Sequence, residues 1–219
     1  MIPKIFYQSW DDELPDYVKK INNLNIPNNF IYKRYSLPQI RKYIRNHHNN
    51  EYLLLFDSYK KIAHKIDLWR YLILYEKGGI YMDADCILLN KIDELLNNDF
   101  IVVHNNKGVK NIFNGFIATV PKNPIIKEII NKMLIIKNSF KNYYFNCKIF
   151  YDVLTKYINI DYKNNFFYST KLDLNICIIY DIYIKGYEIQ KNWIEFNKYY
   201  GFFNNKILFV ENNKYYPYS

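Results

Sequence analysis

Residues 78 to 85 read Gly-Gly-Ile-Tyr-Met-Asp-Ala-Asp, so two carboxylates two positions apart end an apolar run. Because successive side chains of a strand alternate between its faces, a strand here places Tyr81, Asp83 and Asp85 on one face and buries the apolar residues between them on the other. Paired carboxylates at the end of a buried strand are unfavourable unless a cation lies between them. Their oxygens suit Mn²⁺ or Mg²⁺ bound to phosphate oxygens. The segment predicts a metal site that holds a diphosphate, and a solvated strand end is the simpler alternative.

A predicted helix directly upstream carries a second charged pair. Residues from about 59 to 77 follow helical spacing, and a Gly-Gly pair ends them. On this helix Asp67 and Arg70 lie about one turn apart, on the face that also holds the small Ala63. Taken alone, they are an exposed ion pair worth about 0.2–0.5 kcal/mol. Because the helix and the acidic strand are consecutive, the pair is also placed to overhang the same crevice as the two acidic residues.

Three further positions could contact a substrate. Trp10 ends a predicted first strand and is either a core aromatic or a stacking platform for a nucleotide base. The dipeptide Asn114-Gly115 is either a turn or bulge, or an amide that binds sugar hydroxyls where Gly permits a close backbone approach. His104 follows an apolar strand and could contact an acceptor, but a structural role is favoured.

Strands alternate with helices along much of the chain, which predicts an α/β fold with a mostly parallel sheet. The predicted strands are 3–10, 30–35, 80–83, 100–103, 112–120 and 207–210. The predicted helices are 16–24, 36–45, 59–77, 124–137 and 148–157. Ligands of such sheets bind beyond the carboxyl ends of the strands, which is where the two acidic residues fall. No repeat or linker divides the chain, so we expect one domain, 1–219.

The composition sets broad limits on the partners. The net charge is +9, but the lysines are scattered, so a nucleic-acid binder is poorly supported, whereas phosphate-bearing ligands and an anionic membrane surface remain compatible. No run reaches the roughly 18 apolar residues of a membrane span, so membrane contact is expected to be peripheral at most. Cys86, Cys147 and Cys177 form no CxxC pair. With no recognisable leader peptide, we expect reduced thiols and a cytoplasmic protein.

Four segments together resemble a known family. They are residues 2–10 (IPKIFYQSW), 63–71 (AHKIDLWRY), 74–85 (LYEKGGIYMDAD) and 114–124 (NGFIATVPKNP). This pattern is similar to the glycosyltransferase family whose sugar-binding region contains an Asp-x-Asp motif. The family includes the yeast initiating mannosyltransferase and bacterial capsular-polysaccharide transferases, and the large clostridial glucosylating toxins are more distantly similar.

The resemblance implies a GT-A fold, a single Rossmann-like domain with helices flanking the sheet. It also implies a retaining transfer of a hexose from a UDP- or GDP-sugar to a glycan or another hydroxyl acceptor. Residues 1–125 would form the part that binds the nucleotide sugar and the metal, and residues 126–219 the part on the acceptor side. The leaving phosphate would help to deprotonate the acceptor, so that no enzymic nucleophile is needed.

Residue by residue, the resemblance implies that Asp85 binds Mn²⁺ or Mg²⁺ directly and that Asp83 contacts the metal through water and reaches the ribose. Trp10 would stack on the base, and Tyr81 would line the phosphate site. Asp67 and Arg70 would hold hydroxyls of the donor sugar. Relatives usually supply a further metal or diphosphate ligand late in the chain. Here no His follows His104, and Asn192-Trp193 is the nearest substitute.

Two other functions remain open. One is a catalytically inactive relative that only binds a nucleotide sugar or carbohydrate. The other is a phosphohydrolase of the haloacid-dehalogenase type, whose nucleophile motif is also an apolar strand that ends in Asp-x-Asp. Such enzymes need a further acidic pair downstream, and no convincing pair follows Asp99.

Overall fold

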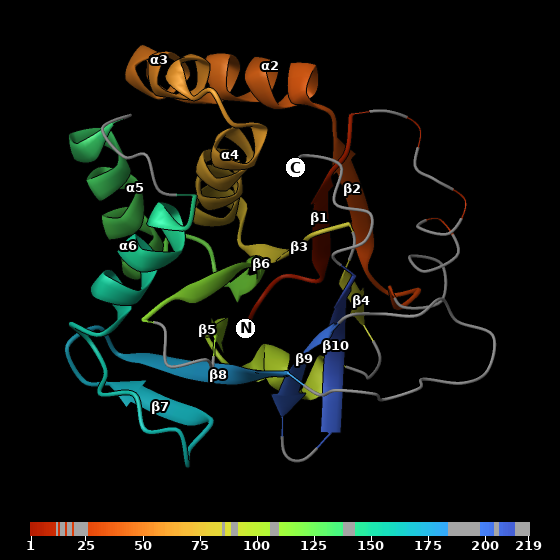
Figure 1. Ribbon diagram of the computed structural model, residues 1–219, viewed down its shortest axis with the longest axis vertical. Coiled ribbons are helices and arrows are strands. Elements are labelled where there is room, and N and C mark those ends of the chain that lie inside the picture. Colours follow the sequence, from red (N-terminus) through yellow and green to blue (C-terminus); the bar gives the residue numbers. More distant parts are fainter. Residues whose placement is uncertain are drawn as a thin grey trace.

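The computed structural model describes residues 1–11, 13, 16, 19, 26–84, 86–88, 92–105, 110–137, 143–183, 198–203 and 206–212. Within them, ten strands form one mixed sheet in the order β2-β1-β3-β6-β5-β8-β9-β10-β4, and β7 pairs with β8 outside this path. Figure 1 shows the helices grouped against one part of this sheet.

The elements have the following bounds. The strands are β1 Ile5–Ser9, β2 Ile31–Tyr35, β3 Gly79–Met82, β4 Cys86–Leu88, β5 Phe100–Asn105, β6 Ile112–Thr119, β7 Phe166–Ser169, β8 Leu174–Tyr183, β9 Lys198–Phe203 and β10 Lys206–Asn212. The helices are α2 Leu37–His47, α3 Asn50–Ser58, α4 Ile62–Lys77, α5 Pro124–Ile136 and α6 Phe145–Leu154, with a short 3-10 helix, η1, at Asp93–Asn97.

Most predicted elements are confirmed, with ends that shift by a few residues. The predicted helix 16–24 lies largely outside the described residues. The predictions missed α3, η1, β4, β7, β8 and β9. The expected α/β class is confirmed. The sheet is mixed rather than mostly parallel. The pairs β1–β2, β1–β3 and β5–β8 are parallel, whereas β3–β6, β5–β6, β7–β8, β8–β9, β9–β10 and β4–β10 are antiparallel. Because the link from β5 to β6 is too short for a crossover helix, these two strands must pair antiparallel.

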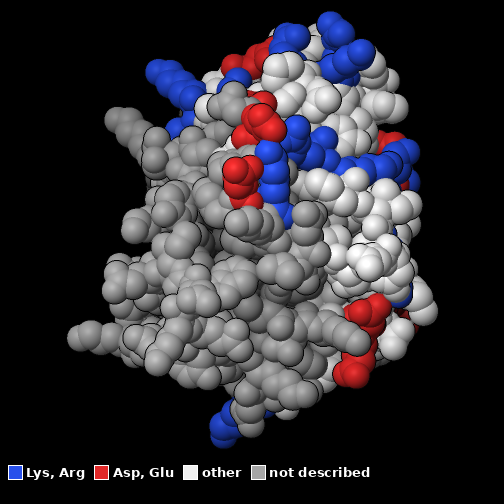
Figure 2. Space-filling model, turned by 90° about the vertical axis from the view of Figure 1, so that its right-hand side faces the viewer, with Lys and Arg blue, Asp and Glu red and all other residues white. Residues whose placement is uncertain are grey.

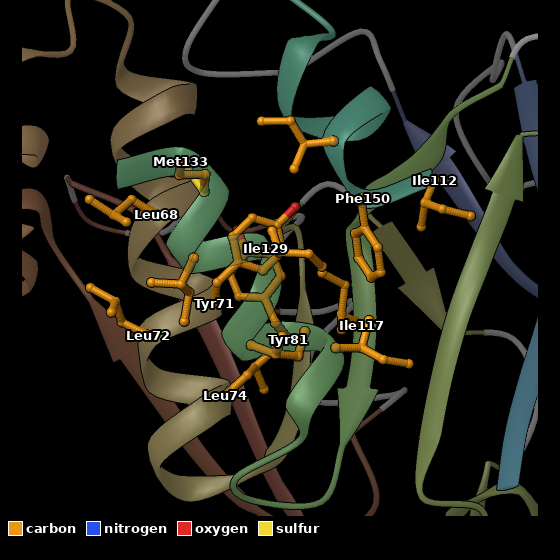
Figure 3. Close-up of a cluster of buried hydrophobic side chains, with 14 of the residues drawn as sticks. Leu68, Tyr71, Leu72, Leu74, Tyr81, Ile112, Ile117, Ile129, Met133 and Phe150 are labelled. Carbon is orange, nitrogen blue, oxygen red and sulfur yellow. The ribbon is translucent and has the colours of Figure 1, made fainter. Parts of the chain in front are cut away.

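Two hydrophobic cores lie on opposite faces of the sheet. Tyr81 belongs to the core that α4, α5 and α6 cover, whereas Ile80 and Met82 belong to the core on the other face. The alternation predicted for this strand is therefore confirmed. Figure 3 shows side chains of α4, α5, α6, β3 and β6 meeting in the first core, among them Tyr71 and Phe150.

Helix α4 is buried on nearly all sides rather than along a single stripe. Every residue from 63 to 74 except Lys65 is buried, because α4 contacts α2, α3, α5, β3 and β6. A helix that neighbours surround in this way has no large solvent-facing side on which to place charges. The alternative of an exposed Asp67–Arg70 pair is therefore wrong, because both residues are buried.

Charged side chains are mixed on the surface. Exposed basic residues of β2 and α2 include Lys33, Lys42 and Arg45, and Arg41 pairs with Asp57 at 2.7 Å. On the face that Figure 2 shows, Lys and Arg gather mainly in the upper part and have Asp or Glu beside them.

The three cysteines are unpaired, as expected. In the part of the chain that the structure describes, no helix combines the length and the apolar character needed to cross a bilayer.

The turn from α4 to β3 depends on two glycines. Gly78 has φ +63° and Gly79 has φ +107°. A Cβ on Gly79 would lie 2.8 Å from the Ile5 carbonyl oxygen and 3.0 Å from the ring of Tyr7. The turn delivers the chain from the end of α4 directly into the strand that carries Asp83.

We predict that Gly79→Ala lowers the free energy of unfolding by about 2 kcal/mol or more, because it combines backbone strain at positive φ with a clash against backbone. Urea unfolding followed by tryptophan fluorescence measures this loss. Asn131→Ala, at an exposed position of α5, is the control and should change the free energy of unfolding by less than about 0.5 kcal/mol. Equal midpoints for the two variants would contradict the role given to Gly79.

Candidate active site

Three neighbouring elements bring the predicted polar residues together. Asp83 directly follows β3, and β3 pairs with β6, so that the Asp83 N–H donates to the Gly115 carbonyl at 2.8 Å. Helix α4 packs against both strands and carries Asp67 and Arg70. The site therefore forms where one helix crosses the ends of two paired strands.

The Arg70 guanidinium is the centre of this cluster. Its Nη2 lies 3.4 Å from Asp67 Oδ1 and 3.3 Å from Asp83 Oδ1, and its Nη1 donates to the Asn114 carbonyl. Its Cζ lies 4.1 Å from the centroid of the Tyr81 ring. The Arg70 side chain is only 2% exposed. One planar cation thus joins two carboxylates from different elements, a geometry that a lysine ammonium cannot reproduce.

Asp83 is held from two directions. The Tyr81 hydroxyl donates to Asp83 Oδ1 at 2.6 Å, and Arg70 faces the same oxygen. Tyr81 and Asp83 are two residues apart on one face of the strand, as the sequence predicts. These contacts fix the carboxylate through one oxygen, while its side chain remains 14% exposed.

Asp67 is held by a residue that the sequence analysis did not identify. Asn146, near the start of α6, donates from Nδ2 to Asp67 Oδ2 at 2.8 Å. On the other side of the cluster, the Tyr71 hydroxyl donates to Asn114 Oδ1 at 2.7 Å. Among the described residues, neither Asn146 Oδ1 nor Asn114 Nδ2 has a hydrogen-bond partner, although both atoms are buried. Buried amide groups of this kind are normally satisfied, so both can bond to a polar ligand.

Protonation limits the chemistry of two neighbours. Burial raises the pKa of the Cys147 thiol to about 12, and the negative charge of Asp67 acts in the same direction. Burial likewise holds the pKa of Tyr71 well above its ordinary value, again with a contribution from Asp67. Both side chains are therefore neutral near pH 7, and Cys147 is not a thiolate nucleophile.

The residues present fit a divalent cation. Oδ1 of Asp83 is engaged with Tyr81 and Arg70. A Cβ on Gly115 would lie 2.7 Å from Asp83 Oδ2 and closer still to Phe113 Cζ, so the glycine lets both the carboxylate and the Phe113 ring come close to the backbone. Among the described residues, no three His, Cys, Asp or Glu side chains form a metal-binding group. A closed protein cage is thus not present in that part of the chain. One or two carboxylates completed by water and phosphate are the usual mode for Mg²⁺.

Other predicted site residues have different outcomes. Trp10 follows β1 at the same edge of the sheet, and its residue is 7% exposed. Its backbone N–H donates to the Tyr35 carbonyl at 3.1 Å. Its stacking role stays a prediction. Asp85 and Asn192-Trp193 lie outside the described residues. His104 is fully buried among tyrosine rings, which agrees with the structural role favoured for it.

Neither Tyr71 nor Asn146 was identified as a site residue from sequence patterns. Tyr71 lies one residue after Arg70 and could have been noted for its hydroxyl. Asn146 is 79 residues from its partner in the sequence, and no local pattern connects two positions so far apart. Its burial between Phe145 and Ile149, rather than its place in the sequence, marks Asn146 as a residue of the site.

The sheet and its flanking helices have the GT-A fold of glycosyltransferases. A solved structure of the PaToxG glycosyltransferase has the same fold, with a TM-score of 0.57 and 16% identity over 72% of this chain and 70% of that one. Residues 3–101 match the family described as "glycosyltransferase sugar-binding region containing DXD motif". An uncharacterised glycosyltransferase of Acanthamoeba polyphaga mimivirus is 30% identical over 190 residues, which cover 83% of this chain and 76% of the relative. The chain belongs to this DXD-containing glycosyltransferase family.

Two fungal relatives match a smaller part of this chain. The initiation-specific alpha-1,6-mannosyltransferase of Candida albicans is 29% identical over 99 residues, which are 45% of this chain and 23% of that protein. An inositol phosphoceramide mannosyltransferase of Schizosaccharomyces pombe is 26% identical over 150 residues, or 66% of this chain and 45% of the relative. The chain thus spans less than half of the length of these two proteins.

We predict that Arg70→Lys lowers glycosyltransferase activity about a hundredfold or more. Without the guanidinium, the carboxylates of Asp67 and Asp83 shift from their positions, and a small misplacement of a reacting or positioning group has an effect of that size. The substitution should also lower the free energy of unfolding by about 2 kcal/mol or more, since the ammonium leaves buried partners unpaired. The matched control is Arg41→Lys, which alters an exposed pair with Asp57 and should leave both properties close to wild type. Activity assays and urea unfolding on both variants make the comparison. Full activity in Arg70→Lys would show that the guanidinium fork is not required.

We also predict that Gly115→Ala lowers activity about tenfold or more, a loss of about 1.4 kcal/mol in transition-state stabilisation. The added methyl would press on Asp83 Oδ2 and on the Phe113 ring. Adding Phe113→Ala removes the ring contact only. If activity stays low in the double variant, the displaced carboxylate is responsible, whereas recovery to wild-type activity would assign the effect to Phe113.

Proposed function

We propose that the chain transfers a hexose from a UDP- or GDP-sugar to a hydroxyl of a glycan or another acceptor, with a divalent metal and with retention at the anomeric carbon. One observation carries this proposal. In a chain of the DXD family, a buried guanidinium joins Asp67 of α4 to Asp83 after β3. Beside it lie buried amide atoms that have no hydrogen-bond partner among the described residues. Such a set of fixed charges and amide groups suits a sugar attached to a diphosphate.

The charge of the cluster supports the metal. Two carboxylates and one guanidinium leave a formal charge of −1 on Asp67, Asp83 and Arg70. A diphosphate would add further negative charge in a largely buried place, which is unfavourable without a cation. A Mn²⁺ or Mg²⁺ ion held by Asp83 and, by family resemblance, Asp85 would neutralise the charge of the departing diphosphate.

The chain's own residues would fix the donor sugar. Asp67 accepts from Asn146 and faces Arg70, so its carboxylate is already oriented to accept hydrogen bonds from sugar hydroxyls. Asn146 Oδ1 and Asn114 Nδ2 add an acceptor and a donor. Gly115 permits close approach beside Asp83, and Tyr81 orients that carboxylate. Positioned dipoles and charges of this kind supply catalysis without a covalent step.

The nucleotide would bind at the carboxyl end of β1. Ser9 is buried and its hydroxyl has no hydrogen-bond partner among the described residues. Trp10 follows it at the same edge as Asp83, because β1 and β3 pair in parallel. The base would lie against Trp10, and the ribose would lie between Trp10 and Asp83.

Retention without an enzymic nucleophile agrees with the protonation of the site. The thiol of Cys147 is protonated at neutral pH because its pKa is raised to about 12. Asp67 and Asp83 are both engaged with Arg70. The incoming hydroxyl would therefore be deprotonated with help from the leaving phosphate on the same face of the sugar.

The names of the fungal relatives make mannose the first donor sugar to test. Residues 1–125 are proposed to bind the donor and residues 126–219 to face the acceptor, with Asn146 reaching across from the second part. We also propose a cytoplasmic location and a peripheral membrane contact through exposed basic residues such as Lys33, Lys42 and Arg45.

The test is the release of nucleotide from a panel of UDP- and GDP-sugars with Mn²⁺, without an added acceptor. We predict release from one donor, lost on chelation of the metal and reduced about a hundredfold or more in Asp83→Ala, because one positioned charged group can contribute that much. The matched control is Asp152→Ala, which removes an exposed carboxylate paired with Lys148. It should keep wild-type activity.

Binding without release would instead favour the inactive relative. Thermal-shift titrations of UDP and GDP with Mn²⁺ detect such binding, since a ligand that binds only the folded state raises its stability. Full activity of Asp83→Ala at limiting Mn²⁺ would contradict the assignment of Asp83 as a metal-binding residue.

A further inference from the structure

Two tyrosines come directly before α6, the helix that supplies Asn146 to the candidate active site. Tyr144 is 58% exposed and Tyr143 is 37% exposed. Their rings meet edge to face, with centroids 5.2 Å apart and an interplanar angle of 85°. They immediately precede α6, whose residue Asn146 donates to Asp67. Two residues of backbone thus separate an exposed aromatic ring from the buried carboxylate cluster.

The position of these tyrosines is fixed from α4. The ring nitrogen Nε2 of His64 lies 3.1 Å from the Tyr143 carbonyl oxygen, and Lys61 Nζ lies 4.8 Å from the centroid of the Tyr143 ring. His64 is itself buried and contacts the rings of Tyr59 and Phe145. The segment is therefore anchored by α4 at one end and by the Asn146–Asp67 bond at the other.

The spacing suits the sugar next to the transferred one. His64 precedes Asp67 by three residues, which is about 4.5 Å along a helix axis at 1.5 Å per residue. The anchor of Tyr143 thus lies roughly one helical turn from the carboxylate that would hold the donor sugar.

The chemistry of the surface suits a carbohydrate. One face of a pyranose ring presents C–H groups that pack on the negative face of an aromatic ring. Tyrosine combines this flat surface with a hydroxyl, and the neighbouring Lys61 supplies further hydrogen-bond donors for sugar hydroxyls. A stacking surface with a polar edge is what a sugar ring requires.

Lys61 lies over the Tyr143 ring, so the more exposed ring of Tyr144 is the stacking surface. We propose that Tyr144, supported by Tyr143, forms an acceptor platform, on which a sugar ring of the acceptor stacks while its hydroxyl faces the donor site. This inference rests on the proposed function, because it assigns the substrate class on the acceptor side of the same site. It makes the acceptor a carbohydrate rather than a bare lipid or protein hydroxyl.

The first test measures nucleotide release as methyl α-mannoside, methyl α-glucoside or methyl β-galactoside is added with the cognate donor. In the wild type, one glycoside accelerates release. Tyr144→Ala raises the half-saturating glycoside concentration about tenfold, a change that corresponds to about 1.4 kcal/mol. Tyr144→Phe keeps the ring and restores the wild-type value. Tyr168→Ala removes another exposed tyrosine, on β7, and leaves the value unchanged.

The second test does not need catalysis. Saturation-transfer NMR with the same glycosides reports binding directly, so failure of the proposed function, seen as no nucleotide release by the wild type, is distinguished from failure of the platform. Saturation transfer that is strong in the wild type and in Tyr168→Ala but weak in Tyr144→Ala supports the platform. Equal signals in wild type and Tyr144→Ala, or no signal from any glycoside with the wild type, would overturn it.

Discussion

A buried guanidinium is unfavourable without partners for its charge, and the arrangement of the site follows from the groups that surround Arg70. Its partners come from three elements: Asp67 on its own helix, Asp83 after β3 and the Asn114 carbonyl in β6. The Tyr81 ring covers its face. Because a buried charge that loses a partner destabilises the fold by several kcal/mol, these groups cannot move independently. The same interaction that closes the core therefore sets the distance between the two carboxylates.

This constraint explains why α4 and β3 are joined by so short a turn. Gly78 and Gly79 adopt positive φ, and only Gly78 lies between the end of α4 and the start of β3. The short turn fixes the position of α4 relative to β3. Arg70 on the helix therefore reaches Asp83, the residue that directly follows the strand. A longer or more flexible connection would let Asp83 move away from the guanidinium. It would expose the carboxylate and weaken the fixed field on which catalysis by positioned charges depends.

The sequence predicted which residues share a face of a strand or helix, because local periodicity controls this. The two-residue period placed Tyr81 and Asp83 on one face, and helical spacing placed Asp67 beside Arg70. It could not predict what depends on distant parts of the chain. Whether α4 is covered on one side or on all sides depends on α2, α3 and α5, so the burial of the charged pair was open. The contact of Asn146 with Asp67 has no local signal. The antiparallel course of β6 follows from the length of a loop rather than from side-chain pattern.

The start of α6 connects the donor cluster to the solvent-facing rim. Asn146 is bonded to Asp67, and the carbonyl of Tyr143 is bonded to His64, so both attachments lead to the same helix, α4. A group bound on Tyr144 would be held at a nearly constant distance from Asp67, because the two share one rigid support. Constant separation of two reactants converts an encounter in solution into a step within one complex, which is a large part of what an enzyme without a nucleophile can contribute. The acceptor platform and the Arg70 cluster would then act as one positioning device, with α4 as its frame.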